Sequence, residues 1–234
     1  FEEKVQELFA AGELPGFVHL YIGQEACAVG VCAHLTSDDY ITSTHRGHGH
    51  CIAKGGDLLK MMAELYAKKT GYNKGKGGSM HIASTEIGIL GANGIIAAGM
   101  PIATGAALSA KYQKNGRVSI AFFGDGASNQ GTFHESINLA SVLKVPVVFV
   151  CENNQFAVGT RINETMNIKD VAIRAKAYGI PGRIVDGQNV IEVYRVAGEL
   201  INDARKGKGP ALLELKTWRF RAHFEGEPAS YRSK

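Results

Sequence analysis

The sequence predicts an α/β fold in which a parallel, twisted sheet is covered by helices on both faces. From residue 117 onward, short apolar segments rich in Val, Ile and Phe alternate with segments of helical length. These apolar segments are continuous rather than alternating, which is typical of strands buried on both faces of a parallel sheet. The Asp-Gly pair at residues 125–126 leads into a helix rather than a second strand, so it is not the turn of a β-hairpin. The following strand is therefore expected to run parallel to the first.

The first 80 residues are expected to be rich in helices and loops. Apolar periodicity predicts three helices there, near residues 1–11, 24–35 and 57–68. The segment YITST at 40–44 predicts a short strand, and the glycine-rich segment KKTGYNKGKGGSMH at 68–81 predicts a loop. A further helix is expected after Pro101.

The second part of the chain has the regular alternation. Strands are predicted at 117–123, 145–150, 183–186 and 210–218, and helices at 132–144, 168–179 and 190–207. We expect a single domain over 1–234, with a helical and loop-rich part at 1–80 and an α/β core at 81–234. The chain does not begin with Met, and it ends without a helix stop signal, so it is interpreted as a segment of a longer subunit.

The composition argues against several classes of partner. Apolar residues make up 45% and charged residues 21% of the chain, and the net charge of +4 is too small to indicate nucleic-acid binding. The most apolar run, residues 94–110, is interrupted by Pro101 and is too weak to span a bilayer. No signal peptide is recognisable, and the four cysteines form no CxxC pair. We therefore expect a cytoplasmic protein with reduced thiols that binds neither nucleic acid nor a membrane.

Polar side chains follow two successive strands of the predicted sheet. Asp125 follows the first, and Asn154, in the segment CENNQF, follows the next. Parallel strands bring their carboxyl ends to the same edge of the sheet, where open α/β sheets bind ligands. Carboxylate and amide oxygens suit Mg²⁺ holding a diphosphate. Gly126 and Ala127 can offer backbone N–H groups to an anion at the start of the next helix.

Two competing phosphate motifs match less well. A dinucleotide fingerprint requires GxGxxG, but Asn129 occupies the position of the last glycine. Glu152 does lie where a ribose-binding acid would, so a dinucleotide-binding oxidoreductase domain stays open as a distant alternative. The segment GYNKGKG has too few residues between its glycines for a Walker loop and lacks the Ser or Thr.

The sequence resembles a known family along nearly its whole length. GDG, 26 further residues and then NN form the thiamine diphosphate motif, and Gly126 and Asn153 have this spacing. In this respect the chain resembles the alpha subunit of the thiamine diphosphate-dependent 2-oxo acid dehydrogenase family. The matching segments are GFVHLYIGQEA, HRGHGH, GKGGSMH, GANGI, FFGDGASNQGTFHE, CENNQF and YRSK. The resemblance implies the diphosphate-type domain of the thiamine diphosphate-binding fold.

The resemblance also implies roles for individual residues. Asp125 and Asn154 would bind Mg²⁺ through their side chains, and Phe156 through its backbone carbonyl. Gly124, Gly126 and Ala127, in the GDGA segment, would hold the diphosphate, with Arg46 and His45 contacting its oxygens. Gly94 and Ile96 would lie against the aminopyrimidine. His19 and His223 would be the catalytic residues at the reacting end, and His223 would also contact the cofactor.

Within the family, ITSTHRGHGHCIAKG and AHFEGE are similar to members that act on acetoin. The implied reaction begins when the thiazolium ylid attacks acetoin, and it releases acetaldehyde. The remaining two-carbon unit is oxidised onto a lipoyl group. The implied partners are a beta subunit in an α₂β₂ heterotetramer and a lipoyl-bearing acyltransferase, with a small molecule as substrate. A pyruvate or branched-chain 2-oxo acid dehydrogenase alpha subunit stays open as the alternative, although those members have Tyr-Arg at His45-Arg46.

The histidines allow less specific interpretations. His45, His48 and His50 alternate along HRGHGH, as the ligands of a transition-metal site could. No Cys or carboxylate accompanies them, and Arg46 would repel a cation, so structural or phosphate-binding roles are favoured. His19 could be a buried histidine of the core. Arginines near His223 should keep its imidazole neutral at neutral pH.

Overall fold

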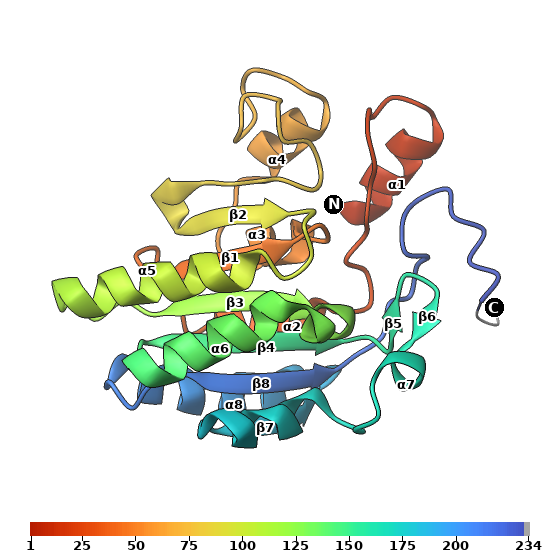
Figure 1. The fold of residues 1–234 in the computed structure, drawn as a ribbon. Helices are drawn as coiled ribbons and strands as arrows, with labels where there is room; N and C mark the ends of the chain where they lie inside the picture. The colour runs from red at the N-terminus through yellow and green to blue at the C-terminus, as the bar shows by residue number, and fades with distance from the viewer. Residues whose placement is uncertain (232–234) are drawn as a thin grey trace.

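The computed structural model describes residues 1–231 and contains a six-stranded sheet with helices on both faces (Figure 1). Every pair of neighbouring strands is parallel. In spatial order the strands are β2 (Ile89–Asn93), β1 (Tyr40–Thr44), β3 (Ser119–Gly124), β4 (Val147–Asn153), β8 (Ala211–Lys216) and β7 (Gly182–Asp186). The predicted α/β class with a parallel sheet is confirmed.

Two hydrophobic cores form, one on each face of the sheet. Successive residues of β3 and β4 alternate between them, as side chains of a pleated strand must. Phe122 and Val148 belong to one core, whereas Phe123 and Phe149 belong to the other. The first core packs against α2 (Glu25–Cys32) and α8 (Val190–Arg205), and the second against α5 (Gly99–Gln113) and α6 (Gly131–Leu143). All seven residues of β4 are buried, which accounts for its apolar run at 147–151.

The remaining elements are short. The helices are α1 (Glu2–Ala10), α3 (His48–Ala53), α4 (Leu58–Leu65) and α7 (Ile162–Thr165). The 3₁₀ helices are η1 (Thr85–Ile87), η2 (Asp125–Asn129) and η3 (Val171–Tyr178). A two-stranded antiparallel sheet is formed by β5 (Phe156–Ala157) and β6 (Thr160–Arg161). No helix within residues 1–231 is long and apolar enough to cross a membrane.

Several elements differ from the sequence-based expectation. The strand β2, the helix α3 and the β5–β6 pair were not predicted, and the helix expected at 168–179 is the 3₁₀ helix η3. The helix α5 begins at Gly99, with Pro101 in its first turn, where a missing N–H costs no helical hydrogen bond. The strand β1 lies inside the sheet between β2 and β3. A division of the chain at residue 80 therefore does not separate the sheet from the N-terminal part.

The strand order determines where a ligand can bind. The chain passes from β1 to β2 on one side and then returns to β3 on the other side of β1. Open parallel sheets bind ligands at such a reversal, outside the carboxyl ends of the strands. The segments that leave β1, β3 and β4 at this edge begin with His45, Asp125 and Asn154. The fold thus collects most of the candidate residues at one edge of the sheet.

Candidate active site

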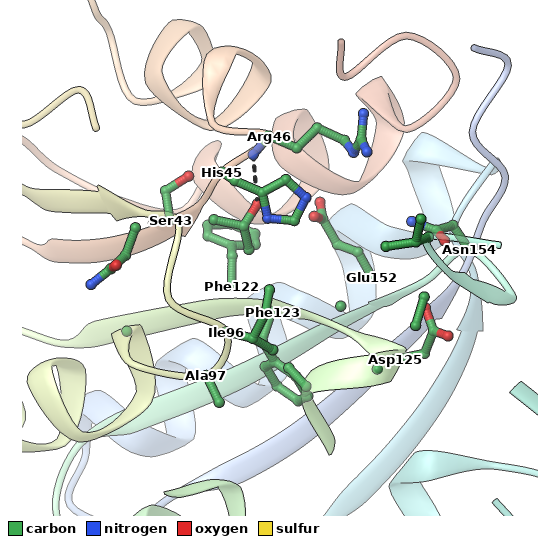
Figure 2. Close-up of a pocket in the computed structure, with 18 of the residues that line it drawn as sticks. Ser43, His45, Arg46, Ile96, Ala97, Phe122, Phe123, Asp125, Glu152 and Asn154 are labelled. Carbon is green, nitrogen blue, oxygen red and sulfur yellow. Dashed lines mark hydrogen bonds between the residues drawn. The ribbon is translucent and has the colours of Figure 1, made fainter. Parts of the chain in front are cut away.

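A cavity of about 280 Å³ lies at the carboxyl edge of the sheet (Figure 2). Its lining comes from the segments that follow β1, β2, β3, β4 and β8. The predicted site residues that line it are His45, Arg46, Ile96, Gly124, Asp125, Gly126, Ala127, Asn154, Phe156 and His223. His19 and Gly94 are adjacent to lining residues rather than part of the lining. The sequence-predicted set is therefore brought together in one place.

Asp125 is a buried carboxylic acid at the end of β3 (Figure 2). Burial raises its pKa from the ordinary value to about 6, because a carboxylate loses hydration in the protein interior. The positive charges of Arg219 and Lys216 offset this effect only in part. Ser128 Oγ donates a hydrogen bond of 2.7 Å to the backbone carbonyl of Asp125 and holds the turn. A bound cation would supply the missing stabilisation of the ionised acid.

Asn154 follows β4 and is also buried. Its Nδ2 donates to Oε1 of Gln24 at 2.9 Å. Its Oδ1 accepts a long hydrogen bond of 3.4 Å from the backbone N–H of Phe156. Amide oxygens have two lone pairs, so this Oδ1 keeps acceptor capacity for a metal.

Phe156 lies on β5, two residues after Asn154. Gln155, between them, has a φ of 74°, in the left-handed region that non-glycine residues rarely adopt. Its backbone N–H donates to Oδ1 of Asn153 at 3.1 Å, which stabilises the turn. The Phe156 ring lies 5.7 Å from the ring of Trp218, measured between centroids.

Within the GDGA segment, position 126 has room only for glycine. A Cβ at Gly126 would lie 2.6 Å from Cβ of Ala157, which is closer than real contacts allow. Gly126 and Ala127 lie in the first turn of the short helix η2, which begins at Asp125, and the first N–H groups of a helix have no helical partner. These N–H groups can therefore donate to an anion.

Three histidine rings form a cluster beside the cavity. The centroid of the His19 ring lies 4.7 Å from that of His45 and 5.1 Å from that of His223. Burial is the largest cause that lowers their pKa values, and the charge of Arg46 lowers them further. The pKa is lowered to about 3 for His19, about 2 for His45 and about 4 for His223. The expected neutrality of His223 is confirmed, with Arg46 and Arg219 as its cationic neighbours.

The ligating nitrogens of these three imidazoles lie within 4.8 Å of one another, which is close enough for a shared transition-metal ion. However, Nη2 of Arg46 lies 3.4 Å from Nδ1 of His223. A guanidinium at this distance opposes a second cation. Neutral imidazoles beside a cavity are better suited to accepting and donating protons.

The structure separates the other histidines of HRGHGH from this cluster. His48 Nδ1 lies 2.9 Å from the carboxylate of Glu2, and His48 Nε2 lies 2.9 Å from Oγ of Ser79. His50 Nε2 lies 3.0 Å from the carboxylate of Glu152. The three histidines of HRGHGH therefore do not converge on one point.

Arg46 supplies a buried positive charge. Its Nη1 donates to the backbone carbonyl of Leu20, and its Nη2 donates to that of His223 at 2.8 Å. Burial lowers its pKa to about 10, with a further contribution from the charge of Arg219, so it stays protonated at neutral pH. Arg46 and Arg219 both line the cavity and favour an anionic ligand there.

Gly94 and Ile96 lie on the segment after β2. Ile96 lines the cavity and is 45% exposed, so it offers an apolar surface to a ligand. A Cβ at Gly94 would lie 3.3 Å from Cε1 of His81, so the ring of His81 lies behind this segment.

Some lining residues were not predicted from the sequence. Gln24, Ser43 and Arg219 line the cavity, and so does Glu152, which the sequence had offered only as a ribose-binding acid. Gln24 lies within the GQEA segment, and Arg219 lies near His223. A single Gln or Arg does not indicate a binding site in a sequence, so neither residue was predicted to line the cavity. Figure 2 shows the Glu152 side chain between His45 and Asn154 in this view.

The residues present fit an anion bridged by a metal to the protein. A buried carboxylate and an amide oxygen lie at one end, and buried arginines line the same cavity. The carboxylate and the anion would repel each other without a cation between them. The fold and the site thus define an α/β protein that binds an anionic, metal-bridged ligand at the carboxyl edge of its sheet.

Comparison with known proteins identifies the family. The family model for the dehydrogenase E1 component matches residues 1–234, and the chain belongs to this family. The family is generally dependent on thiamine diphosphate. The resemblance inferred from the sequence is thereby confirmed. The last residues of the YRSK segment, 232–234, lie outside the described residues.

Curated relatives cover the whole chain. The alpha subunit of acetoin:2,6-dichlorophenolindophenol oxidoreductase from Bacillus subtilis (strain 168) is 58% identical over 234 residues, or 100% of this chain and 70% of the relative. The corresponding subunit from Cupriavidus necator is 54% identical over 233 residues, with the same coverage. The pyruvate dehydrogenase E1 component subunit alpha of Rhizobium meliloti (strain 1021) is 44% identical over 234 residues, or 100% of this chain and 67% of the relative. Each is an alpha subunit, which implies a beta subunit as its partner.

Proposed function

We propose that this chain is the alpha subunit of a thiamine diphosphate-dependent enzyme that cleaves acetoin to acetaldehyde and passes the two-carbon unit to a lipoyl group. The observation that supports this most directly is the pair Asp125 and Asn154 at one end of the cavity, in a chain more similar to the two acetoin oxidoreductase subunits than to the pyruvate dehydrogenase subunit. His45 is consistent with this preference, because the pyruvate enzymes have tyrosine there.

Mg²⁺ would be held by the side-chain oxygens of Asp125 and Asn154 and by the backbone carbonyl of Phe156. The diphosphate would accept hydrogen bonds from N–H groups of Gly126 and Ala127, beside Gly124, and would meet the charge of Arg46. Gly94 and Ile96 would lie against the aminopyrimidine. When bound, thiamine diphosphate supplies the carbanion chemistry that breaks a carbon–carbon bond next to a carbonyl.

Histidines of the cluster would accept and donate protons at the reacting end of the cofactor. Burial and the charge of Arg46 lower the pKa values of His19 and His223, so their imidazoles are neutral at neutral pH. Each would use its free ring nitrogen to accept a hydrogen bond, and in the reaction a proton, from the substrate hydroxyl. His19 and His223 are the proposed catalytic residues. The protonated form would be short-lived, since Arg46 and burial both disfavour it.

A beta subunit would supply the part of the site that this chain lacks, in an α₂β₂ assembly. A lipoyl-bearing acyltransferase would receive the two-carbon unit. Both partners follow from the family rather than from any surface of this chain.

Substrate choice can be tested by reconstitution. The full-length alpha subunit is combined with its beta subunit, and the reduction of 2,6-dichlorophenolindophenol is measured with acetoin and with pyruvate. We expect acetoin to give the larger kcat/KM. A larger value for pyruvate would replace the proposed substrate while leaving the cofactor site in place.

The metal site can be tested separately. Asp125→Asn removes one negative charge with little change of shape, and thiamine diphosphate binding to the αβ complex is measured by titration calorimetry with and without Mg²⁺. We expect binding to weaken by at least tenfold. Asp203→Asn on the surface of α8, where Asp203 pairs with Lys208, is the matched control. Tight, Mg²⁺-dependent binding by Asp125→Asn would refute the proposed metal ligand.

A further inference from the structure

Gln24 is a buried amide at the edge of the cavity that has no role in the proposed chemistry. It lies immediately before α2, it is 1% exposed, and it contributes to the lining of the cavity. Its Oε1 accepts the 2.9 Å hydrogen bond from Nδ2 of Asn154. Its Nε2, in contrast, is buried and has no hydrogen-bond partner among residues 1–231.

This half-satisfied amide is unfavourable for stability. A buried donor without a partner costs about 1–3 kcal/mol, whereas an apolar side chain of the same shape would avoid this cost. Packing alone would therefore favour Met or Leu at this position. The atom Oε1 does have a partner, which is Nδ2 of Asn154. This contact is therefore the reason that we assign to an amide at position 24.

Two contacts together determine the orientation of the Asn154 amide. The oxygen and nitrogen ends of an asparagine have nearly the same shape, so sterics alone do not distinguish them. The N–H of Phe156 can face only the oxygen end of Asn154, so Oδ1 lies there, and Oε1 of Gln24 accepts from Nδ2 at the other end. Oδ1 of Asn154 therefore lies on the side away from Gln24, where it accepts the long bond from Phe156 N–H.

We infer that Gln24 is a positioning residue that presents Oδ1 of Asn154, rather than its Nδ2, to the metal. The inference rests on the proposed function, because it requires that Asn154 binds a metal. A metal ligand held by a hydrogen-bonded neighbour is a common arrangement, and loss of such a neighbour typically lowers metal affinity by about 10–100-fold.

The turn that carries Gln24 is itself held firmly. Gln188 Nε2 donates hydrogen bonds of 2.7 Å to the carbonyl of Gly23 and to Oγ1 of Thr217. Gly23 has a φ of +102°, and a Cβ there would lie 2.5 Å from the carbonyl oxygen of Trp218. Gln24 N–H donates to the carbonyl of Tyr21 at 3.1 Å. Gln24 therefore presents its side chain to Asn154 from a rigid backbone.

The test uses the αβ complex with Mn²⁺ and thiamine diphosphate. Mn²⁺ affinity is measured by electron paramagnetic resonance, and fluorescence of Trp218, which lies beside Phe156, reports on cofactor binding. We expect Gln24→Met to weaken Mn²⁺ binding by about 10–100-fold without lowering the midpoint of urea unfolding of the metal-free protein. Gln24→Glu keeps an acceptor for Nδ2 and should restore Mn²⁺ affinity to within about threefold of the wild type.

A double-mutant cycle shows whether Gln24 acts through Asn154. If it does, Gln24→Met in an Asn154→Ala background causes no further loss of Mn²⁺ affinity. Losses that add independently would overturn the inference. Gln188→Met makes the same chemical change in the supporting turn without touching Asn154, and it should leave Mn²⁺ affinity unchanged. An equal effect of Gln188→Met and Gln24→Met would also overturn the inference, since a loosened turn would then explain both.

The outcome for the wild type separates this inference from the proposed function. If the wild-type complex binds no Mn²⁺ with thiamine diphosphate, the proposed function fails. If the wild type binds Mn²⁺ and Gln24→Met binds it equally well, only the positioning role of Gln24 fails.

Discussion

The hydroxyl of Tyr21 donates a hydrogen bond to the carboxylate of Glu152, a residue 131 positions further along the chain. The same carboxylate oxygen lies 3.0 Å from Nε2 of His50, whose Nδ1 lies 2.7 Å from Oγ of Ser43. The His50 ring stacks on that of Phe122, with centroids 3.9 Å apart. A buried carboxylate is thus held by two donors from the N-terminal part of the chain, which ties that part to β4.

Removal of the Tyr21 hydroxyl tests how much its hydrogen bond to Glu152 contributes to the free energy of unfolding. Tyr21→Phe leaves the buried Glu152 carboxylate with one donor fewer, and we expect the free energy of unfolding to fall by about 1–3 kcal/mol. Urea unfolding followed by circular dichroism measures the change. Tyr112→Phe is the matched control, because Tyr112 is 88% exposed. Equal stabilities of the two variants would show that the hydrogen bond to Glu152 contributes nothing.

Glu64 organises the glycine-rich loop at 68–81. Its Oε2 accepts from the N–H groups of Asn73 and Gly75 at 2.7 and 2.9 Å, and its Oε1 from those of Gly77 and Gly78 at 2.7 and 3.1 Å. The side chain is fully buried, so water cannot replace these bonds.

Glu64→Gln places an NH₂ group opposite two of these backbone donors. We expect a loss of about 3 kcal/mol in the free energy of unfolding, because two N–H groups lose their acceptor. Hydrogen exchange measured by mass spectrometry should speed up within the loop while the sheet stays protected. Glu199→Gln, on the exposed surface of α8, should change neither quantity. Unaltered exchange in the loop of Glu64→Gln would contradict this role of Glu64.

The class of fold and most of the site could be predicted from the sequence because both depend on local patterns. The continuous apolar run of β4 reflects its burial on both faces, and the spacing of Asp125 and Asn154 reflects one βαβ unit between adjacent strands. Parallel strands then bring these residues to the carboxyl edge of the sheet, whatever the conformation of the segments that connect the strands. No knowledge of distant contacts is needed for this step.

The elements that were missed depend on distant contacts. The strand β2 contains Gly91, with a φ of +148°, and it is stabilised by pairing with β1 rather than by its own β propensity. Gln24 was recognised only as part of a motif, because the atom that gives it a role, Nδ2 of Asn154, lies 130 positions away in the sequence. Contacts of this kind leave no periodic signal in one sequence.

The ion pair between the buried Asp39 and the partly exposed Arg205 predicts a pH dependence of stability. Burial alone would raise the pKa of Asp39, but hydrogen bonds from Arg205 and from backbone N–H groups of Thr36 and Val118 outweigh it and lower the pKa. Between the two pKa values the unfolded chain binds more protons than the folded protein. The contribution of Asp39 is therefore complete above its ordinary pKa of about 3.9 and is lost as the pH falls through its folded value.

Asp39→Asn should remove this contribution. We expect a loss on the order of 3 kcal/mol at neutral pH, and the difference from the wild type should shrink as the pH falls below about 4. Urea unfolding of both proteins across this pH range measures the difference. Asp38→Asn is the matched control, since the Asp38 side chain is 71% exposed and its pair with Arg117 lies at the surface. A difference for Asp39→Asn that stays constant with pH would contradict an ionised, hydrogen-bonded Asp39.

The histidine cluster provides a prediction about protonation itself. With pKa values lowered to about 3, 2 and 4, His19, His45 and His223 should remain neutral between about pH 8 and 5. Their Hε1 resonances, assigned by single His→Gln variants, should therefore not move over this range, whereas added free imidazole does. The unfolded chain takes up these protons near pH 6.5, so the cluster also lowers stability progressively as the pH falls below that value. A midpoint near 6.5 for any of the three would show that burial and Arg46 do not keep it neutral.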